Sequence, residues 1–207
     1  ESSAKHADKI INKAKVYESL EDAVSNYDLV IATSNRKRFL TKKTYDSFNI
    51  LQKKIRDFKN TAILFGPENS GLSNQDIRLA NFLFTIPTYN TNKSLNLSHA
   101  VSVMSYELFQ ANNTSFKNTS TSNIDKVSKF EFSNFINVLV KDLDSRGFFK
   151  PIEKKASMID NIYSIYNKTD LSKKELRMLW GIHKKLKNQP KSWNNGFDIN
   201  KLISIYP

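Results

Sequence analysis

Two stretches of the sequence decide the fold, LFGPENSGLS at residues 64–73 and SLNLSHAV at residues 94–101. The first follows an apolar run that begins at Thr61, and it ends on a helix-capping pair formed by Ser73 and Asp76. This pattern predicts a glycine-bearing loop between a buried strand and a helix. In α/β proteins, a loop at the carboxyl end of a strand is a common place for a ligand.

The glycines of the first stretch do not form a phosphate-binding P-loop. Gly66 and Gly71 have the P-loop spacing, but Leu72 stands where a P-loop needs a lysine to reach the phosphates. Glu68 also adds negative charge inside the loop. The sequence has no G-x-G-x-x-G pattern either, so a conventional dinucleotide site is not supported.

The second stretch offers several polar side chains directly before an apolar helix. One Ser or Asn suffices to cap a helix N-terminus, whereas Ser94, Asn96 and Ser98 all stand here. The excess suggests a binding site built on the start of the helix. The helix itself is predicted to pack one face on the sheet, because apolar residues recur at helical spacing: Leu97, Ala100, Val101, Met104 and Leu108.

Helical and extended patterns alternate over the first half of the chain, which predicts an α/β layer with a mostly parallel sheet. Strands are expected at residues 27–33, 61–65 and 82–87, and Ser19 with Asp22 is expected to cap a short helix before the first of them. Residues 1–111 are accordingly predicted to form one domain. Asn, Ser, Thr and Lys dominate residues 112–129, which are predicted to form a polar linker.

Residues 130–207 are predicted to form an all-helical extension. A capping box of Ser128 and Glu131 opens a helix that ends at Gly147, and a second box of Ser172 and Glu175 opens another. A further helix is expected between them, around residues 158–163. The apolar stripes of the first and last helices are predicted to be buried: Phe132, Phe135, Ile136, Leu139 and Leu143, and then Leu176, Leu179, Trp180 and Leu186.

The charge balance favours a polyanionic partner, and nucleic acid is the first candidate. The 207 residues carry a net charge of +12, with 32 Lys and Arg against 20 Asp and Glu. Lys and Asn enrichment can also reflect genome composition. The absence of cysteine excludes disulfides and thiolate metal sites, and no apolar run reaches the roughly 20 residues of a membrane span. The three histidines stand apart from one another. We therefore expect a cytoplasmic protein without a metal site.

Together with Ile86-Pro87, the two stretches resemble motifs two and three of the SPOUT superfamily, and within it the TrmH-like RNA 2′-O-methyltransferases of the TrmJ type. The turn at residues 33–36 resembles that family's first cofactor contact. Residues 147–149 and 179–182 resemble its helical C-terminal extension. The resemblance implies a trefoil knot at the end of the sheet, a homodimer, and S-adenosyl-L-methionine as methyl donor. It also implies a cofactor site made of these residues: Thr33, Ser34, Asn35, Gly66, Glu68, Gly71, Ile86, Lys93, Ser94 and Leu95.

The implied reaction is transfer of the sulfonium methyl group to a ribose 2′-hydroxyl of RNA, with position 32 of the tRNA anticodon loop as the expected target. Ser94 and Asn96 match the positions that orient the nucleophile or its base. The family's base is an arginine in an N-terminal Asn-x-Gly-x-x-x-Arg motif, which this sequence lacks. Arg36 is an alternative base, although it matches a different arginine of the family. The resemblance and the missing initiator methionine together imply that roughly 40 to 50 further residues precede Glu1.

The lysines and arginines of the C-terminal helices are predicted to contact tRNA phosphates, although an ordinary solvated helix face has the same pattern. The predicted RNA contacts are Arg36, Lys154, Lys155, Lys173, Lys174, Arg177, Lys184 and Lys185, with Lys187 beside them. Two alternatives stay open. One is a knotted RNA-binding protein without catalysis, and the other is a TrmH-like enzyme that acts on rRNA or on another tRNA position.

Overall fold

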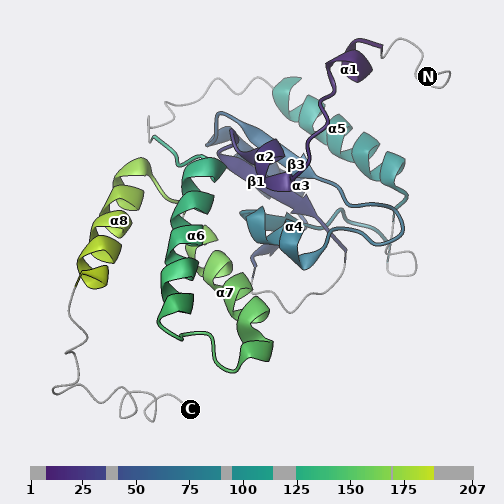
Figure 1. The fold of residues 1–207 in the computed structure, drawn as a ribbon. Helices are drawn as coiled ribbons and strands as arrows, with labels where there is room; N and C mark the ends of the chain where they lie inside the picture. The colour runs from purple at the N-terminus through teal and green to yellow at the C-terminus, as the bar shows by residue number, and fades with distance from the viewer. Residues whose placement is uncertain (1–7, 36–41, 90–94, 114–124, 169, 189–207) are drawn as a thin grey trace.

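The computed structural model describes residues 8–35, 42–89, 95–113, 125–168 and 170–188. Its centre is a sheet of four parallel strands in the order β2-β4-β1-β3 (Figure 1). The strands are β1 (Leu29–Thr33), β2 (Thr44–Tyr45), β3 (Thr61–Leu64) and β4 (Phe82–Phe84). The predicted α/β class and parallel sheet are confirmed. The knot implied by the family resemblance stays an expectation, because residues 90–94, which follow the last strand, lie outside the described residues.

Three of the strands were expected, and the short edge strand β2 was not. Its two residues pair with β4 through Thr44 opposite Leu83 and Tyr45 opposite Phe84. A two-residue strand carries too little alternation for a sequence pattern to mark it. β4 is also shorter than expected: it ends at Phe84, and Ile86 and Thr88 beyond it line a cavity.

The sheet is buried on both faces, because successive side chains of strand β1 point alternately into two different apolar clusters. Leu29 and Ile31 join one apolar cluster, with Leu51 of α3 and Met104 of α5, whereas the side chains of Val30 and Ala32 join the other. α3 (Phe48–Arg56) and α5 (Leu97–Asn113) cover the first face. The second face packs against α2 (Leu20–Val24) and α4 (Asn74–Leu79), while α1 (Asp8–Lys13) buries no residue.

Helix α5 was predicted to pack one face on the sheet, and the structure confirms this packing. Met104 is fully buried at its centre, and Leu97, Ala100 and Leu108 are partly buried beside it. Val101, which was assigned to the same face, is 39% exposed and lies at its edge.

The C-terminal helices share an apolar core with the sheet. They are α6 (Lys129–Ser145), the single 3₁₀ turn η1 (Ile152–Lys154), α7 (Lys155–Asn167) and α8 (Lys173–Lys187). Phe132, Phe135 and Ile136 of α6 are buried in the same cluster as Val30 of β1. The division into two domains and a linker stays a prediction, since most of the linker (114–124) lies outside the described residues.

The predicted caps of these helices are confirmed. Ser128 with Glu131 and Ser172 with Glu175 form complete capping boxes, and α6 ends at Ser145, two residues before Gly147, whose φ is +72°. The burial predicted for Leu186 is wrong, because its side chain is 54% exposed. Ten residues beyond the buried Leu176, it points about 80° away from that residue around the helix axis.

A polar network ties α4 to α7 beneath the sheet. The Arg78 guanidinium donates to the Asp160 carboxylate at 2.6 and 2.7 Å, and the Asn167 amide donates to the Arg78 carbonyl at 3.1 Å. Lys42 Nζ donates to that same carbonyl at 3.0 Å, and burial lowers the pKa of Lys42 to about 7. The fully buried Lys129 donates to Asn167 at 3.0 Å, and burial likewise lowers its pKa. None of the helices in the described part of the chain is long and apolar enough to cross a membrane.

Candidate active site

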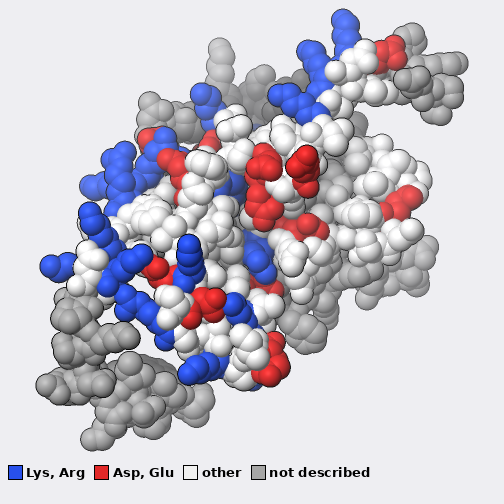
Figure 2. Space-filling model, in the orientation of Figure 1, with Lys and Arg blue, Asp and Glu red and all other residues white. Residues whose placement is uncertain are grey.

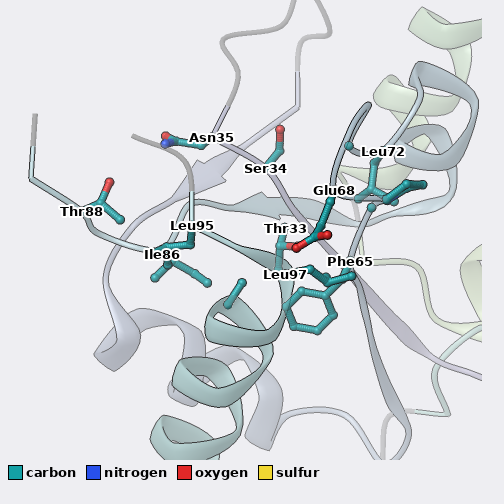
Figure 3. A pocket seen from close by; sticks show the side chains of 14 residues that line it. Thr33, Ser34, Asn35, Phe65, Glu68, Leu72, Ile86, Thr88, Leu95 and Leu97 are labelled. Atoms are coloured by element: carbon teal, nitrogen blue, oxygen red, sulfur yellow. The ribbon is translucent and has the colours of Figure 1, made fainter. Parts of the chain in front are cut away.

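A cavity of about 350 Å³ lies at the carboxyl ends of β1, β3 and β4, where the parallel strands end at one edge (Figure 3). This is the edge at which open α/β sheets bind ligands, and the volume is within the range of small-molecule pockets. Its lining comes from the loops after the three strands and from the start of α5: Thr33, Ser34, Asn35, Phe65, Gly66, Pro67, Glu68, Gly71, Leu72, Ile86, Thr88, Leu95, Leu97 and Ala100.

The loop from Gly66 to Leu72 is folded back so tightly that both of its glycines are required. A Cβ added at Gly66 would lie 2.2 Å from the Leu72 nitrogen, so only glycine fits there. Gly71 has a φ of +64° and donates its N–H to the Pro67 carbonyl at 2.7 Å. Leu72 is buried and anchors the loop in the core, and the Ser73 capping box starts α4 directly after it.

Asn96 joins the two sequence motifs at the start of α5. Its Oδ1 accepts the Ser98 N–H at 2.9 Å, which makes it the N-cap of the helix. Its Nδ2 donates to Glu68 Oε1 at 2.5 Å across 28 residues of sequence. The orientation of the Asn96 amide is therefore set from both sides, by the helix start and by the glycine loop.

The turn after β1 is held to both neighbouring strands. The Thr33 hydroxyl donates to the Leu64 carbonyl at 2.8 Å, and the Ser34 N–H donates to the Phe84 carbonyl at 3.1 Å. The Ser34 carbonyl in turn accepts the Thr85 hydroxyl at 2.7 Å. These bonds fix the wall of the cavity that Thr33 and Ser34 form.

The structure brings most of the residues predicted for the cofactor site to this one cavity. Thr33, Ser34, Asn35, Gly66, Glu68, Gly71, Ile86 and Leu95 all line it. Asn96 is not among the lining residues, but it contacts Glu68 at the cavity wall. Lys93 and Ser94, as well as Arg36, lie outside the described residues.

Six lining residues were not predicted: Phe65, Pro67, Leu72, Thr88, Leu97 and Ala100. Phe65, Pro67 and Leu72 flank the predicted glycines, so the motif itself could have indicated them. Leu97 and Ala100 were assigned to helix packing only. No sequence signal marks Thr88.

The predicted RNA contacts that can be described lie on η1, α7 and α8. Lys155 and Lys173 are engaged in ion pairs, with Asp144 at 2.8 Å and Asp125 at 3.1 Å. The hydrogen bond to Asp125 raises the pKa of Lys173. The other five have no acidic partner within the described part of the chain: Lys154, Lys174, Arg177, Lys184 and Lys185. Figure 2 shows Lys and Arg side chains gathered over the C-terminal helices.

Comparison with known proteins gives the class of this site. Residues 1–106 match the model of the SpoU rRNA methylase family. A tRNA (cytidine/uridine/adenosine-2′-O-)-methyltransferase TrmJ of Pseudomonas aeruginosa is 29% identical over 191 residues, which are 86% of this chain and 74% of the relative. An uncharacterized tRNA/rRNA methyltransferase of Haemophilus influenzae is 30% identical over 182 residues, 85% of this chain and 73% of the relative.

A solved structure shares the fold over most of the chain. The crystal structure of TrmJ from Z. mobilis superposes with a TM-score of 0.79 at 28% identity, covering 90% of this chain and 79% of that one. The chain therefore belongs to the SpoU methylase family, and its class is that of RNA ribose 2′-O-methyltransferases. The family resemblance predicted from the two motifs is confirmed, and the relatives that match nearly the whole chain include TrmJ proteins.

Proposed function

We propose that the protein transfers the methyl group of S-adenosyl-L-methionine to a ribose 2′-hydroxyl of tRNA in the cytoplasm, at position 32 of the anticodon loop. The observation that carries this proposal is the convergence of both motifs on one cavity, joined by the hydrogen bond between Glu68 and Asn96. The TrmJ relatives support the substrate, because their names describe tRNA 2′-O-methylation.

The residues of the cavity fit such a methyl donor. Ile86, Leu95 and Leu97 line the cavity and offer apolar contacts for an adenine ring. Glu68 is the charged side chain of the lining, and its carboxylate suits a donor that carries a sulfonium cation. The donor supplies an activated methyl group, and the protein supplies alignment.

The alignment of the acceptor is assigned to Ser94 and Asn96. The reaction needs the ribose oxygen in line with the methyl group and a group that removes its proton. Asn96 suits the positioning part, because contacts with Ser98 and Glu68 leave its amide little freedom to rotate. A variant with Ser94→Ala and Asn96→Ala should lose methyl transfer and bind tRNA with nearly unchanged affinity.

The direct test is tritiated methyl transfer to tRNA transcripts, followed by digestion and identification of the labelled nucleoside. Label in the ribose at position 32 supports the proposal. Label in a base would overturn the 2′-O assignment, and label in the ribose of another nucleotide would overturn position 32. Titration calorimetry with S-adenosyl-L-methionine tests the cofactor separately, and a folded protein that releases no heat counts against it.

We further propose that the protein acts as a homodimer through the outer face of α5. Tyr106 and Phe109 are 60% and 61% exposed there, and Val103 is 36% exposed beside them. Exposed apolar side chains on one helix face are typical of a subunit interface. The expected mass by light scattering is that of two chains, and Phe109→Glu should shift it to one. A monomeric wild-type protein would contradict the proposal.

A further inference from the structure

Helix α8 contains a glycine at a position where no contact within the described chain requires one. Glycine is the poorest helix former after proline, and Gly181 stands in the middle of the helix. A Cβ added there would meet no atom within 4 Å, so the space beside its Cα is open. Glycine in such a position is typical of a close approach by another molecule.

Gly181 forms part of the floor of a groove of about 300 Å³ between α6 and α8. The groove is lined by Val138 from α6 and by Trp180, Gly181, His183, Lys184 and Lys187 from α8. Trp180 is partly buried, and its ring is held edge-on against Phe135 with 5.3 Å between the ring centres. The groove therefore offers a rigid aromatic surface next to exposed backbone.

The rim of the groove is cationic. Lys184 is exposed and has no acidic partner among the described residues. Lys187 and His183 share the Asp142 carboxylate, at 3.1 and 2.9 Å, which offsets the charge of Lys187. Lys184 is thus the stronger site for an anion. Helix α8 as a whole carries six Lys and Arg against one Glu. This charge favours a polyanion as its binding partner over a neutral or weakly acidic protein surface.

We propose that this groove binds one unpaired nucleotide of the RNA, with its base over Gly181 beside Trp180 and its phosphate at Lys184. The proposal rests on the proposed function, to which it adds a second RNA contact apart from the methyl-transfer cavity. An aromatic platform with a neighbouring cation is the usual arrangement for unpaired nucleotides, because any base can stack and every nucleotide carries a phosphate. The charge of the rim favours RNA over a second copy of this basic chain.

The test follows the fluorescence of Trp180 in the full chain with Trp193→Phe, which leaves one tryptophan. The probe is a 5′-phosphorylated pentauridylate, which has no duplex structure. Saturable quenching is expected, since a stacked base quenches indole emission. Gly181→Leu should weaken binding at least about fivefold by filling the groove, given the strength of base stacking on aromatic side chains. Gly181→Ala is the matched control, which improves the helix but adds only one methyl group.

A second variant tests the phosphate contact. Lys184→Gln should lower the salt dependence of pentauridylate binding by about one phosphate contact, without changing the melting temperature. An unquenched Trp180, or equal affinity of Gly181→Leu and Gly181→Ala, overturns the proposal. Two other results for Gly181→Leu would also overturn the proposal. A lower melting temperature would indicate that the chain's own residues 189–207 occupy the groove, and a lower mass of the assembly in solution would indicate that a second copy of the chain does. If the protein binds pentauridylate in this way but transfers no methyl group to tRNA, the proposed function is contradicted and the groove proposal is not.

Discussion

Replacement of Gly66 by alanine is expected to distort the loop that lines the proposed methyl-donor cavity. The new Cβ would stand 2.2 Å from the Leu72 nitrogen and 2.3 Å from the Gly71 carbonyl carbon. The nearer atom must retreat by about 1.2 Å to reach the 3.4 Å at which ordinary contact begins. Both atoms belong to the backbone of the loop that lines the cavity, and Leu72 is anchored in the core, so no flexible side chain can absorb the shift.

The expected cost is at the upper end of the overpacking range, about 3 kcal/mol, which for a chain of this size lowers Tm by about 6–12 °C. Methyl transfer should fall by about a hundredfold, since a displacement of 1 Å has that effect on reacting geometry. Differential scanning calorimetry and titration with S-adenosyl-L-methionine measure the two effects.

Gly71→Ala is the matched control for the same loop. Gly71 has free space around its Cα but a φ of +64°, so alanine there costs about 1–2 kcal/mol of backbone strain and leaves the cavity wall in place. Gly66→Ala should therefore be more harmful than Gly71→Ala to cofactor binding. Wild-type binding and stability in the Gly66→Ala protein would refute the steric argument.

Three further predictions concern the core beneath the cavity. Asp160→Asn leaves Arg78 without its counter-charge and should lower the free energy of unfolding by about 3 kcal/mol in urea titrations, whereas an unchanged midpoint would show that the pair contributes little. Burial lowers the pKa of Lys42 from 10.5 to about 7, so between these pH values the unfolded chain binds more protons than the folded chain, and the free energy of unfolding should rise with pH. Lys42→Met should reduce this slope by up to about 1.4 kcal/mol per pH unit, as measured by urea titrations between pH 7 and 9. Phe135→Ala should lower stability by about 3–5 kcal/mol in one thermal transition, because α6 shares its core with the sheet, and two separate transitions would contradict this.

The parts of the fold that the sequence predicted are those that depend on local patterns. The capping boxes of Ser73, Ser128 and Ser172 are each complete within four residues, and the stop at Gly147 needs only a positive φ. The strand at 29–33 is continuously apolar because it is central and covered on both faces. The edge strand at Thr44–Tyr45 has no local capping pattern and no continuous apolar run, and it is defined by its pairing with β4.

The candidate site was predictable as two motifs, but its internal contacts were not. The bond between Glu68 and Asn96 depends on where α5 begins relative to the glycine loop, and no periodicity of either segment encodes that distance. Lys42 and Lys129 are a second case, because lysines are mostly exposed and their positions in the sequence look like linker or loop. Their burial follows from the packing of α6 and α7 beneath the sheet. The C-terminal helices therefore do more than carry the predicted RNA contacts, since the polar network fixes Arg78 in α4, the helix that starts from the loop at the proposed methyl-donor cavity.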